Sequence, residues 1–217
     1  MTQANGTRRI GLLGAGNIGR PIGRHWLAAG HTVTFGSRSP QRLASFIGPL
    51  GPGARAASYA DAATAGDVVM LAVPHQALDE LLDTVRDRLA GKIVIDAANP
   101  MGLSPDGRII STLDPGVTQG RRTADLLPDS TVVRAFTHVM DELLWSRGTR
   151  QRHFWGMALA SDDAEAKDLV SNLILDAGFS PVDLGGLDDS SALDPGGRVF
   201  PHMFTPADLR AAVTLVG

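Results

Sequence analysis

The sequence predicts an α/β fold in which a doubly wound, mainly parallel sheet carries a small C-terminal α/β elaboration. A glycine-rich turn lies between an apolar run and a helical segment near the N-terminus, and short β-rich runs alternate with helical stripes further along. Of the 217 residues, 43% are hydrophobic, which is enough to bury a sizeable core. Such alternation favours a parallel sheet with helices on both faces. We expect one domain over 1–217, with a core over 1–135 and the elaboration over 136–217.

The stretch RIGLLGAGNIGRPIGRHWLAAGHTVTFGSR, residues 9–38, is typical of a βαβ unit that binds a dinucleotide. Its turn has the spacing GxGxxG. Gly14 permits a tight turn, Gly16 lets a pyrophosphate approach the backbone, and Gly19 lets the helix lie close to its strand. The free N–H groups at the start of that helix attract phosphate. The predicted phosphate site comprises Gly14, Ala15, Gly16, Asn17, Ile18 and Gly19.

The second strand of this unit ends in FGSRS, which favours NADP(H) over NAD(H). Units selective for NAD place an acidic residue here for the ribose hydroxyls, but this chain has Gly36, Ser37 and Arg38. A guanidinium and hydroxyls bind a 2′-phosphate through charge-assisted hydrogen bonds, whereas a carboxylate repels it. The alternative is a serine-rich turn that caps the next helix and leaves Arg38 solvated.

Strand and helix signals continue to alternate after this unit. Pro40 can begin a short helix that ends at Gly48. Two continuous apolar runs, separated by a helical stripe, read as parallel strands covered on both faces. The predicted elements are a strand stub near 54–56, a helix over 58–66, a strand over 68–74, a helix over 75–89 and a strand over 92–97.

The C-terminal part is less regular. Residues 101–119 are rich in Gly, Pro, Ser and Asp and predict a long loop, a kind of segment that is often functional. Thr205 and Pro206 can cap and begin a terminal helix. The other predicted elements are a helix end and turn over 123–130, strands over 131–136, 153–161 and 179–185, a helix over 164–178, an irregular stretch over 188–204, and the terminal helix over 205–216.

Candidate ligand-binding residues follow the strands that end near residues 74 and 97. In open α/β sheets, ligands bind beyond the carboxyl ends of the strands. Walls for the ribose or nicotinamide, and a hydrogen-bond partner at Asn99, are therefore expected there. Ordinary turn chemistry is the alternative, because Pro and Asn are frequent where strands stop. The candidates are Val73, Pro74, His75, Ala98 and Asn99.

Composition excludes several classes of protein. The formal net charge of -3 gives no general attraction to nucleic acid or to an anionic membrane. The chain has no cysteine, which excludes disulfides, thiolate metal sites and cysteine nucleophiles. The N-terminus lacks the apolar segment of a signal peptide, and no apolar run is long enough to span a bilayer. We expect a cytoplasmic protein with a small-molecule acceptor, without nucleic-acid or membrane partners.

Few side chains suggest acid or base chemistry. His138, in AFTHVMDELLW, is the best candidate for proton donation or for contact with an acceptor ring, with a structural hydrogen-bonding role as the alternative. Arg147, Arg150 and Arg152 could hold an anionic substrate tail or could form a solvated face. No pair of histidines has the helical spacing of a metal site, so no metal is predicted.

Several segments together resemble the coenzyme F420-dependent NADP oxidoreductase family, which includes NADPH:F420 reductases and is similar to the oxidoreductase domain of the STEAP metalloreductases. The resemblance covers roughly residues 9–185. In chain order, its segments are GLLGAGNIG, FGSRS, LAVP, IDAANP, VVRAF and SDDAEAKDLVSNLILDAGFSPVDLG.

The resemblance implies one Rossmann-like domain with a small C-terminal elaboration, and often a homodimer. It also implies NADPH bound at residues 14–19 and at Ser37 and Arg38. Thr137 and His138 depart from the pattern, because family members usually have Asn-Thr or His-Thr after this strand. The departures lie where the second substrate is expected.

These observations predict an NADPH-dependent oxidoreductase that transfers hydride to a second bound acceptor, most simply coenzyme F420 or a flavin. Hydride transfer between two rings needs stacking and exclusion of water more than a strong protein acid. The alternatives are reduction of a small imine, enone or ketone in a biosynthetic pathway, with His138 or a loop hydroxyl as proton source, and a noncatalytic NADP-binding sensor.

Overall fold

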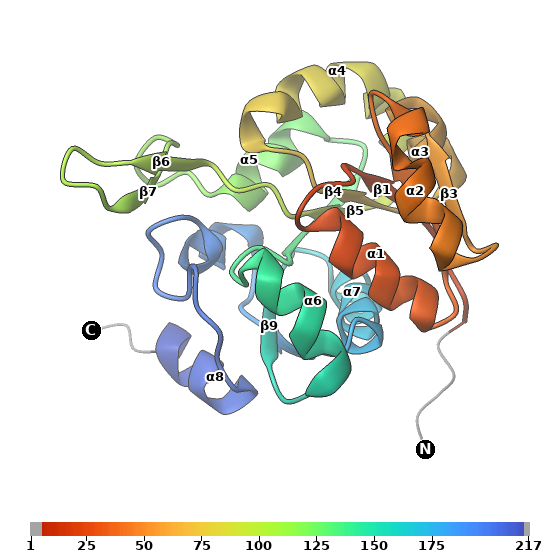
Figure 1. Ribbon diagram of the computed structural model, residues 1–217. Coiled ribbons are helices and arrows are strands. Elements are labelled where there is room, and N and C mark those ends of the chain that lie inside the picture. Colours follow the sequence, from red (N-terminus) through yellow and green to blue (C-terminus); the bar gives the residue numbers. More distant parts are fainter. Residues whose placement is uncertain (1–5, 215–217) are drawn as a thin grey trace.

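The computed structural model describes residues 6–214 (Figure 1). Within this range, one eight-stranded sheet has the order β10-β9-β8-β5-β4-β1-β2-β3, and a separate two-stranded sheet pairs β6 with β7. The strands are β1 Arg9–Leu13, β2 Thr32–Gly36, β3 Ala54–Ala57, β4 Val68–Leu71, β5 Ile93–Asp96, β6 Met101–Leu103, β7 Ile109–Ser111, β8 Thr131–Ala135, β9 Gly156–Ala160 and β10 Ser180–Asp183.

Helices connect these strands. The α-helices are α1 Gly19–Ala28, α2 Ala44–Ile47, α3 Tyr59–Ala65, α4 Leu78–Leu89, α5 Gln119–Leu126, α6 Asp141–Arg150, α7 Ala164–Asp176 and α8 Pro206–Thr214. The 3-10 helices are η1 Pro40–Leu43, η2 Gly48–Leu50, η3 His75–Ala77 and η4 Leu187–Leu193.

The sheet separates two apolar layers. Successive residues of β4 point to opposite faces: Met70 packs with side chains of α1 and α7, whereas Val69 and Leu71 pack with those of α3 and α4. Because both faces are covered, the central strands are mostly apolar, with Asp96 at the end of β5 and Arg134 in β8 as charged exceptions. In the first layer, Trp26 donates a hydrogen bond to the Leu173 carbonyl oxygen (2.8 Å), which ties α1 to α7.

The sheet is parallel except between β8 and β9, which pair antiparallel. β10 then pairs parallel with β9 at the sheet edge. The predicted doubly wound, mainly parallel sheet is therefore confirmed. A third apolar cluster, containing Val182, Leu193 and Leu209, packs η4 and α8 against the β9–β10 end of the sheet.

The structure corrects the prediction in three places, and the first is the stretch predicted to be irregular over 188–204, which begins with the 3-10 helix η4. The loop predicted over 101–119 contains the β6–β7 hairpin, which projects from the body of the molecule (Figure 1). The helix α6, for which no element was predicted, follows β8 and packs on α1. The terminal helix begins as predicted, with Thr205 Oγ1 accepting from the Asp208 N–H (3.3 Å). Its predicted end at 215–216 lies outside the described residues.

Candidate functional site

The turn after β1 has a conformation that requires glycine. Gly14 has a φ of 115°, and its N–H donates to the Gly36 carbonyl oxygen (3.2 Å). A methyl group at Gly19 would overlap the Gly14 carbonyl oxygen, so α1 can lie this close to β1 because position 19 has no side chain. The tight turn and the close helix packing predicted for these glycines are both present.

The outer part of this turn is open. Gly16 and Asn17 are exposed, and a methyl group at Gly16 would meet no protein atom within 4 Å. Within residues 6–214, no hydrogen bond uses the N–H groups of Ala15, Gly16 or Asn17. The positive end of α1 lies beside these three donors. This part of the turn therefore has the space and the free donors that a pyrophosphate requires.

The end of β2 lies next to the turn. The Ser37 N–H donates to the Ala57 carbonyl oxygen (3.0 Å), and Ser37 Oγ accepts from the Ser39 N–H (3.1 Å). Arg38 is exposed and lines a cavity of about 200 Å³ whose other walls include Tyr59 and Leu81. Apolar side chains make up most of the lining, and Glu80 and Thr84 lie among them. An adenine can pack against such apolar side chains, and the Arg38 guanidinium can bind a phosphate on the adenosine ribose.

Residues after β4 form another wall of this cavity. Val73 is buried, Pro74 is exposed, and both line the cavity. Burial lowers the pKa of His75, and the nearby Arg122 guanidinium lowers it further. His75 Nδ1 is buried without a hydrogen-bond partner among the described residues. At neutral pH, His75 is therefore an uncharged side chain at the edge of the site.

The residues after β5 are held rigidly. Ala98 is buried, and Asn99 is half-buried. Asn99 Nδ2 donates to the Thr137 carbonyl oxygen (3.0 Å), and Asn99 Oδ1 accepts from Arg134 (2.9 Å). Both ends of the Asn99 amide are thus fixed before any ligand binds.

All thirteen predicted binding residues and the predicted catalytic residue lie within the described part of the chain, and Ile18, in the glycine-rich turn, is half-buried against the first apolar layer. Neighbours in the sheet are β5, β4, β1 and β2, and the candidates follow the carboxyl ends of these four strands. The structure therefore brings the glycine-rich turn, the β2 end, the β4 end and the β5 end to one edge. His138 follows β8 at the same edge but faces the interior.

His138 is fully buried between backbone groups. Its Nδ1 lies 3.0 Å from the His202 carbonyl oxygen, and its Nε2 lies 3.1 Å from the Ala158 nitrogen. The carbonyl needs a proton on Nδ1, and the amide N–H needs an unprotonated Nε2, so these contacts select one neutral tautomer. Burial lowers the pKa of His138 to about 4. This geometry favours the structural alternative over proton donation.

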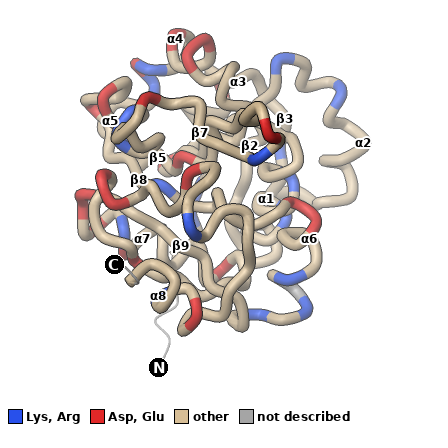
Figure 2. Tube along the Cα trace, turned by 90° about the vertical axis from the view of Figure 1, so that its left-hand side faces the viewer, with Lys and Arg blue, Asp and Glu red and all other residues tan. Residues whose placement is uncertain are grey.

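The predicted arginine cluster lies elsewhere. Arg147 Nη1 donates to Gln151 Oε1 (2.8 Å). Arg150 lines a separate cavity of about 310 Å³ with Arg24 and Trp145, between α1 and α6. Figure 2 shows several basic positions close together near α6. This cavity shares no lining residue with the one beside Arg38.

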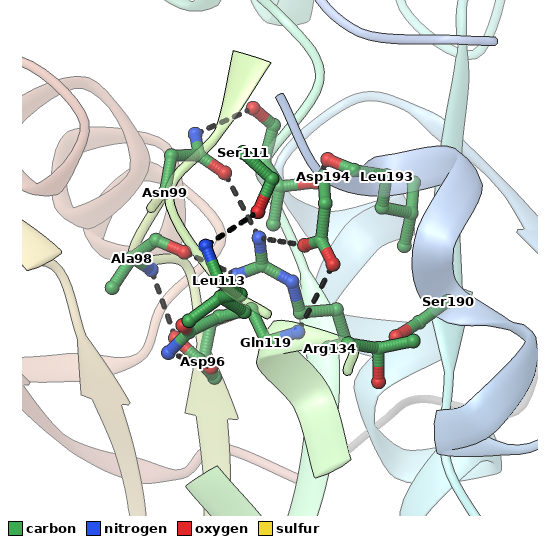
Figure 3. A network of polar contacts seen from close by, with 12 residues as sticks. Asp96, Ala98, Asn99, Ser111, Leu113, Gln119, Arg134, Ser190, Leu193 and Asp194 are labelled. Carbon is green, nitrogen blue, oxygen red and sulfur yellow. Dashed lines mark hydrogen bonds and ion pairs between the residues drawn. The ribbon is translucent and has the colours of Figure 1, made fainter. Parts of the chain in front are cut away.

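A buried ionic group formed by Arg134, Asp96 and Asp194 was not predicted from the sequence. Arg134 and Asp96 are completely buried, and Asp194 is 5% exposed. Arg134 Nη2 donates to Asp194 Oδ1 (2.9 Å) (Figure 3). Thr123 Oγ1 donates to Asp96 Oδ2 (2.7 Å). The sequence features that could have revealed this group are one charged residue within the apolar run VVRA and another at the end of IVID.

Residues 6–214 contain neither a metal-binding cluster nor a membrane-spanning helix. No group of three or more His, Cys, Asp or Glu side chains there could hold a metal ion. None of the helices in this range combines the length and the apolar character needed to cross a bilayer.

The fold and this edge of the sheet define a Rossmann-like, nucleotide-binding class of protein. Residues 9–100 match the family model described as NADP oxidoreductase, coenzyme F420-dependent. The F420-dependent NADP reductase of Methanothermobacter marburgensis is 29% identical over 196 residues, which cover 84% of this chain and 86% of the relative. The resemblance to the coenzyme F420-dependent NADP oxidoreductase family is thus confirmed.

Two other similarities extend over most of the chain. A hypothetical protein from Sinorhizobium meliloti has a crystal structure that matches with a TM-score of 0.80 at 28% identity, covering 92% of this chain and 96% of that chain. Metalloreductase STEAP3 from Rattus norvegicus is 30% identical over 182 residues, 82% of this chain. These residues are 34% of STEAP3, so this chain spans about a third of the length of that relative.

Proposed function

We propose that this protein is an NADPH-dependent oxidoreductase that transfers hydride between NADP(H) and a second bound acceptor, with coenzyme F420 or a flavin as the first choice. The observation that carries this proposal is the edge where the open glycine-rich turn lies beside the Arg38 cavity. The match to the F420-dependent family over residues 9–100 supports the choice of acceptor.

Each predicted binding residue has a role in this proposal. The pyrophosphate is bound by the N–H groups of residues 14–19, and the 2′-phosphate by Ser37 and Arg38. Val73, Pro74 and His75 contact the adenosine part, and residues 98–99 contact the nicotinamide part. The shared cavity supports the adenosine assignment, because Val73 and Pro74 line it together with Arg38. The sheet order supports the nicotinamide assignment, because β5 lies farther from β2 than β1 and β4 do.

The cofactor supplies the hydride, and the protein binds and orients the two rings. A ring acceptor such as a deazaflavin takes up hydride without a strong protein acid. The burial of His138 and its two backbone contacts are compatible with such a reaction. They argue against the imine, enone or ketone reductase in which His138 would donate the proton.

We further propose that residues 1–217 act as one domain in a cytoplasmic homodimer. The β6–β7 hairpin supports self-association, because β6 and β7 pair only with each other among the described residues. Four of its side chains are exposed and apolar: Met101, Leu103, Ile109 and Ile110. Exposed apolar surface next to free strand edges is typical of an interface.

The function is tested by mixing the protein with NADPH and F420 under anaerobic conditions and following the deazaflavin absorbance. We expect the absorbance to bleach at a rate proportional to the protein concentration, and the bleaching to reverse with NADP⁺ and reduced F420. Turnover of an imine, enone or ketone without F420 reduction would favour the second enzyme class. Tight binding of NADPH without oxidation by any acceptor would favour a sensor.

A further inference from the structure

A guanidinium lies buried behind the candidate nicotinamide site. Arg134 on β8 is completely buried, and its Nη1 and Nη2 atoms donate to four oxygens (Figure 3). Three of these oxygens belong to the end of β5 and the segment that follows it: the Asp96 carbonyl, the Ala98 carbonyl and Asn99 Oδ1. One side chain therefore fixes the course of this segment.

The contact with Arg134 decides what Asn99 can offer a ligand. Asn99 Oδ1 accepts from the guanidinium, and Nδ2 gives one N–H to the Thr137 carbonyl oxygen. A flipped amide would place N–H groups against the guanidinium and an oxygen against the carbonyl, so the orientation is fixed. The second N–H of Nδ2 has no partner among the described residues. Asn99 thus presents a hydrogen-bond donor.

The guanidinium is itself held from the C-terminal part of the chain. Asp194 follows η4, and its Oδ1 accepts from Arg134 Nη2 (2.9 Å). Its Oδ2 accepts from the Gln119 N–H (3.0 Å), at the first residue of α5. Burial raises the pKa of Asp194, so its carboxylate is costly to keep ionised there. Buried ion pairs add little net stability compared with apolar packing, but they fix geometry.

We propose that Arg134 and Asp194 are positioning residues that hold the Asn99 amide so that its free N–H donates to the nicotinamide half of the dinucleotide. The inference rests on the proposed function, because it requires that NADP(H) binds at this edge. It goes beyond the proposed function in one respect: the contact between Arg134 and Asp194, in the C-terminal segment, controls the geometry of the nicotinamide half of the site. Neither residue touches the dinucleotide in this assignment.

The test compares two ligands by calorimetry: NADPH, and adenosine 2′,5′-bisphosphate, which lacks the nicotinamide half. In Asn99→Ala and in Arg134→Lys, we expect the dissociation constant of NADPH to rise about tenfold, the loss of one hydrogen bond. The dissociation constant of the bisphosphate should stay within about twofold of wild type. Asn172→Ala, the same change on α7, is the matched control and should alter neither constant.

A double variant separates positioning from a general loss of structure. If Arg134 acts through Asn99, Arg134→Lys combined with Asn99→Ala should bind NADPH no more weakly than Asn99→Ala alone. If Arg134→Lys does not fold, Asp194→Asn takes its place. Equal weakening of both ligands, or a double variant whose loss is the product of the single losses, would overturn the inference. A wild-type protein that binds neither ligand would instead refute the proposed function.

Discussion

Arg38 is the side chain that should set the choice between the two nicotinamide cofactors. Its guanidinium is exposed at the rim of the cavity beside β2, where it can reach a 2′-phosphate that NADH lacks. Arg38→Ala should raise the dissociation constant of NADPH by about 10- to 100-fold, as expected for a charge-assisted hydrogen bond, and leave that of NADH nearly unchanged.

The matched control is Arg88→Ala, which removes the same charge near the far end of α4. It should leave both dissociation constants unchanged. If Arg38→Ala weakens NADH and NADPH equally, the assignment of the 2′-phosphate to Arg38 is wrong.

His138 should make stability depend on pH. Its pKa is about 4 in the folded protein, whereas an unfolded histidine titrates near 6.5. Between these values the unfolded chain binds the proton and the folded protein does not, so the free energy of unfolding falls as the pH falls. The loss from pH 6.5 to 4 amounts to about 3 kcal/mol for this group.

Urea unfolding at a series of pH values measures this loss. His138→Gln cannot titrate, so its free energy of unfolding should change less steeply over the same range. Other groups remain in both proteins and cancel in the comparison. Identical slopes for the variant and the wild type would show that His138 titrates as an exposed histidine does.

Two glycines of the β1–turn–α1 unit should have different roles. Gly19 should matter for stability, and Gly16 should matter for binding. A methyl group at position 19 would overlap the Gly14 carbonyl oxygen, whereas one at position 16 would enter open space. Gly19→Ala should therefore lower the free energy of unfolding by about 1–3 kcal/mol, as overpacking does. Gly16→Ala should fold normally but bind NADPH more weakly, because its methyl group occupies the space assigned to the pyrophosphate.

Thermal unfolding and calorimetry on the two variants provide the test, and each variant is the control for the other. A Gly16→Ala protein with unchanged NADPH affinity would mean that the pyrophosphate does not lie on this turn.

The β6–β7 hairpin should be the element that joins two copies of the chain. Leu103 is 71% exposed, and Ile109 is its cross-strand partner. Leu103→Glu combined with Ile109→Glu would place four like charges across a symmetric contact, and light scattering should then show a monomer where the wild type shows a dimer. Met140→Glu, at an exposed apolar residue outside the hairpin, should leave the dimer intact.

The strands of the main sheet and their mainly parallel pairing could be predicted from local signals, but the strand order, the antiparallel β8–β9 pair and the contacts between distant segments could not. The β1–α1–β2 unit and the strands ending near residues 71 and 96 carry apolar runs bounded by glycine or proline, which are signals of short range. The hairpin strands are three residues long, too short to establish a period. The helix α6 mixes apolar, acidic and basic residues, so its sequence gave no clear stripe.

In the candidate site, too, features within one stretch of chain could be predicted, whereas contacts between distant segments could not. The glycine spacing and the Ser37–Arg38 pair could be recognised because each lies within one stretch of chain. The Arg134 contacts could not, because they join residue 134 to residues 96–99 and to residue 194. The chemistry of His138 and its place after a strand predict a catalytic role, but the sequence does not reveal that both of its ring nitrogens meet backbone groups.

The hairpin lies outside the sheet order, and residues 101–117 contribute no side chain to the three buried apolar clusters of the described chain. Insertions, deletions or exchanges in it leave the layers on either side of the sheet intact. The hairpin segment begins immediately after Pro100, and Pro100 directly follows the candidate nicotinamide-binding residues 98–99. The hairpin of this chain could therefore be exchanged or shortened while the nucleotide-binding scaffold keeps its packing.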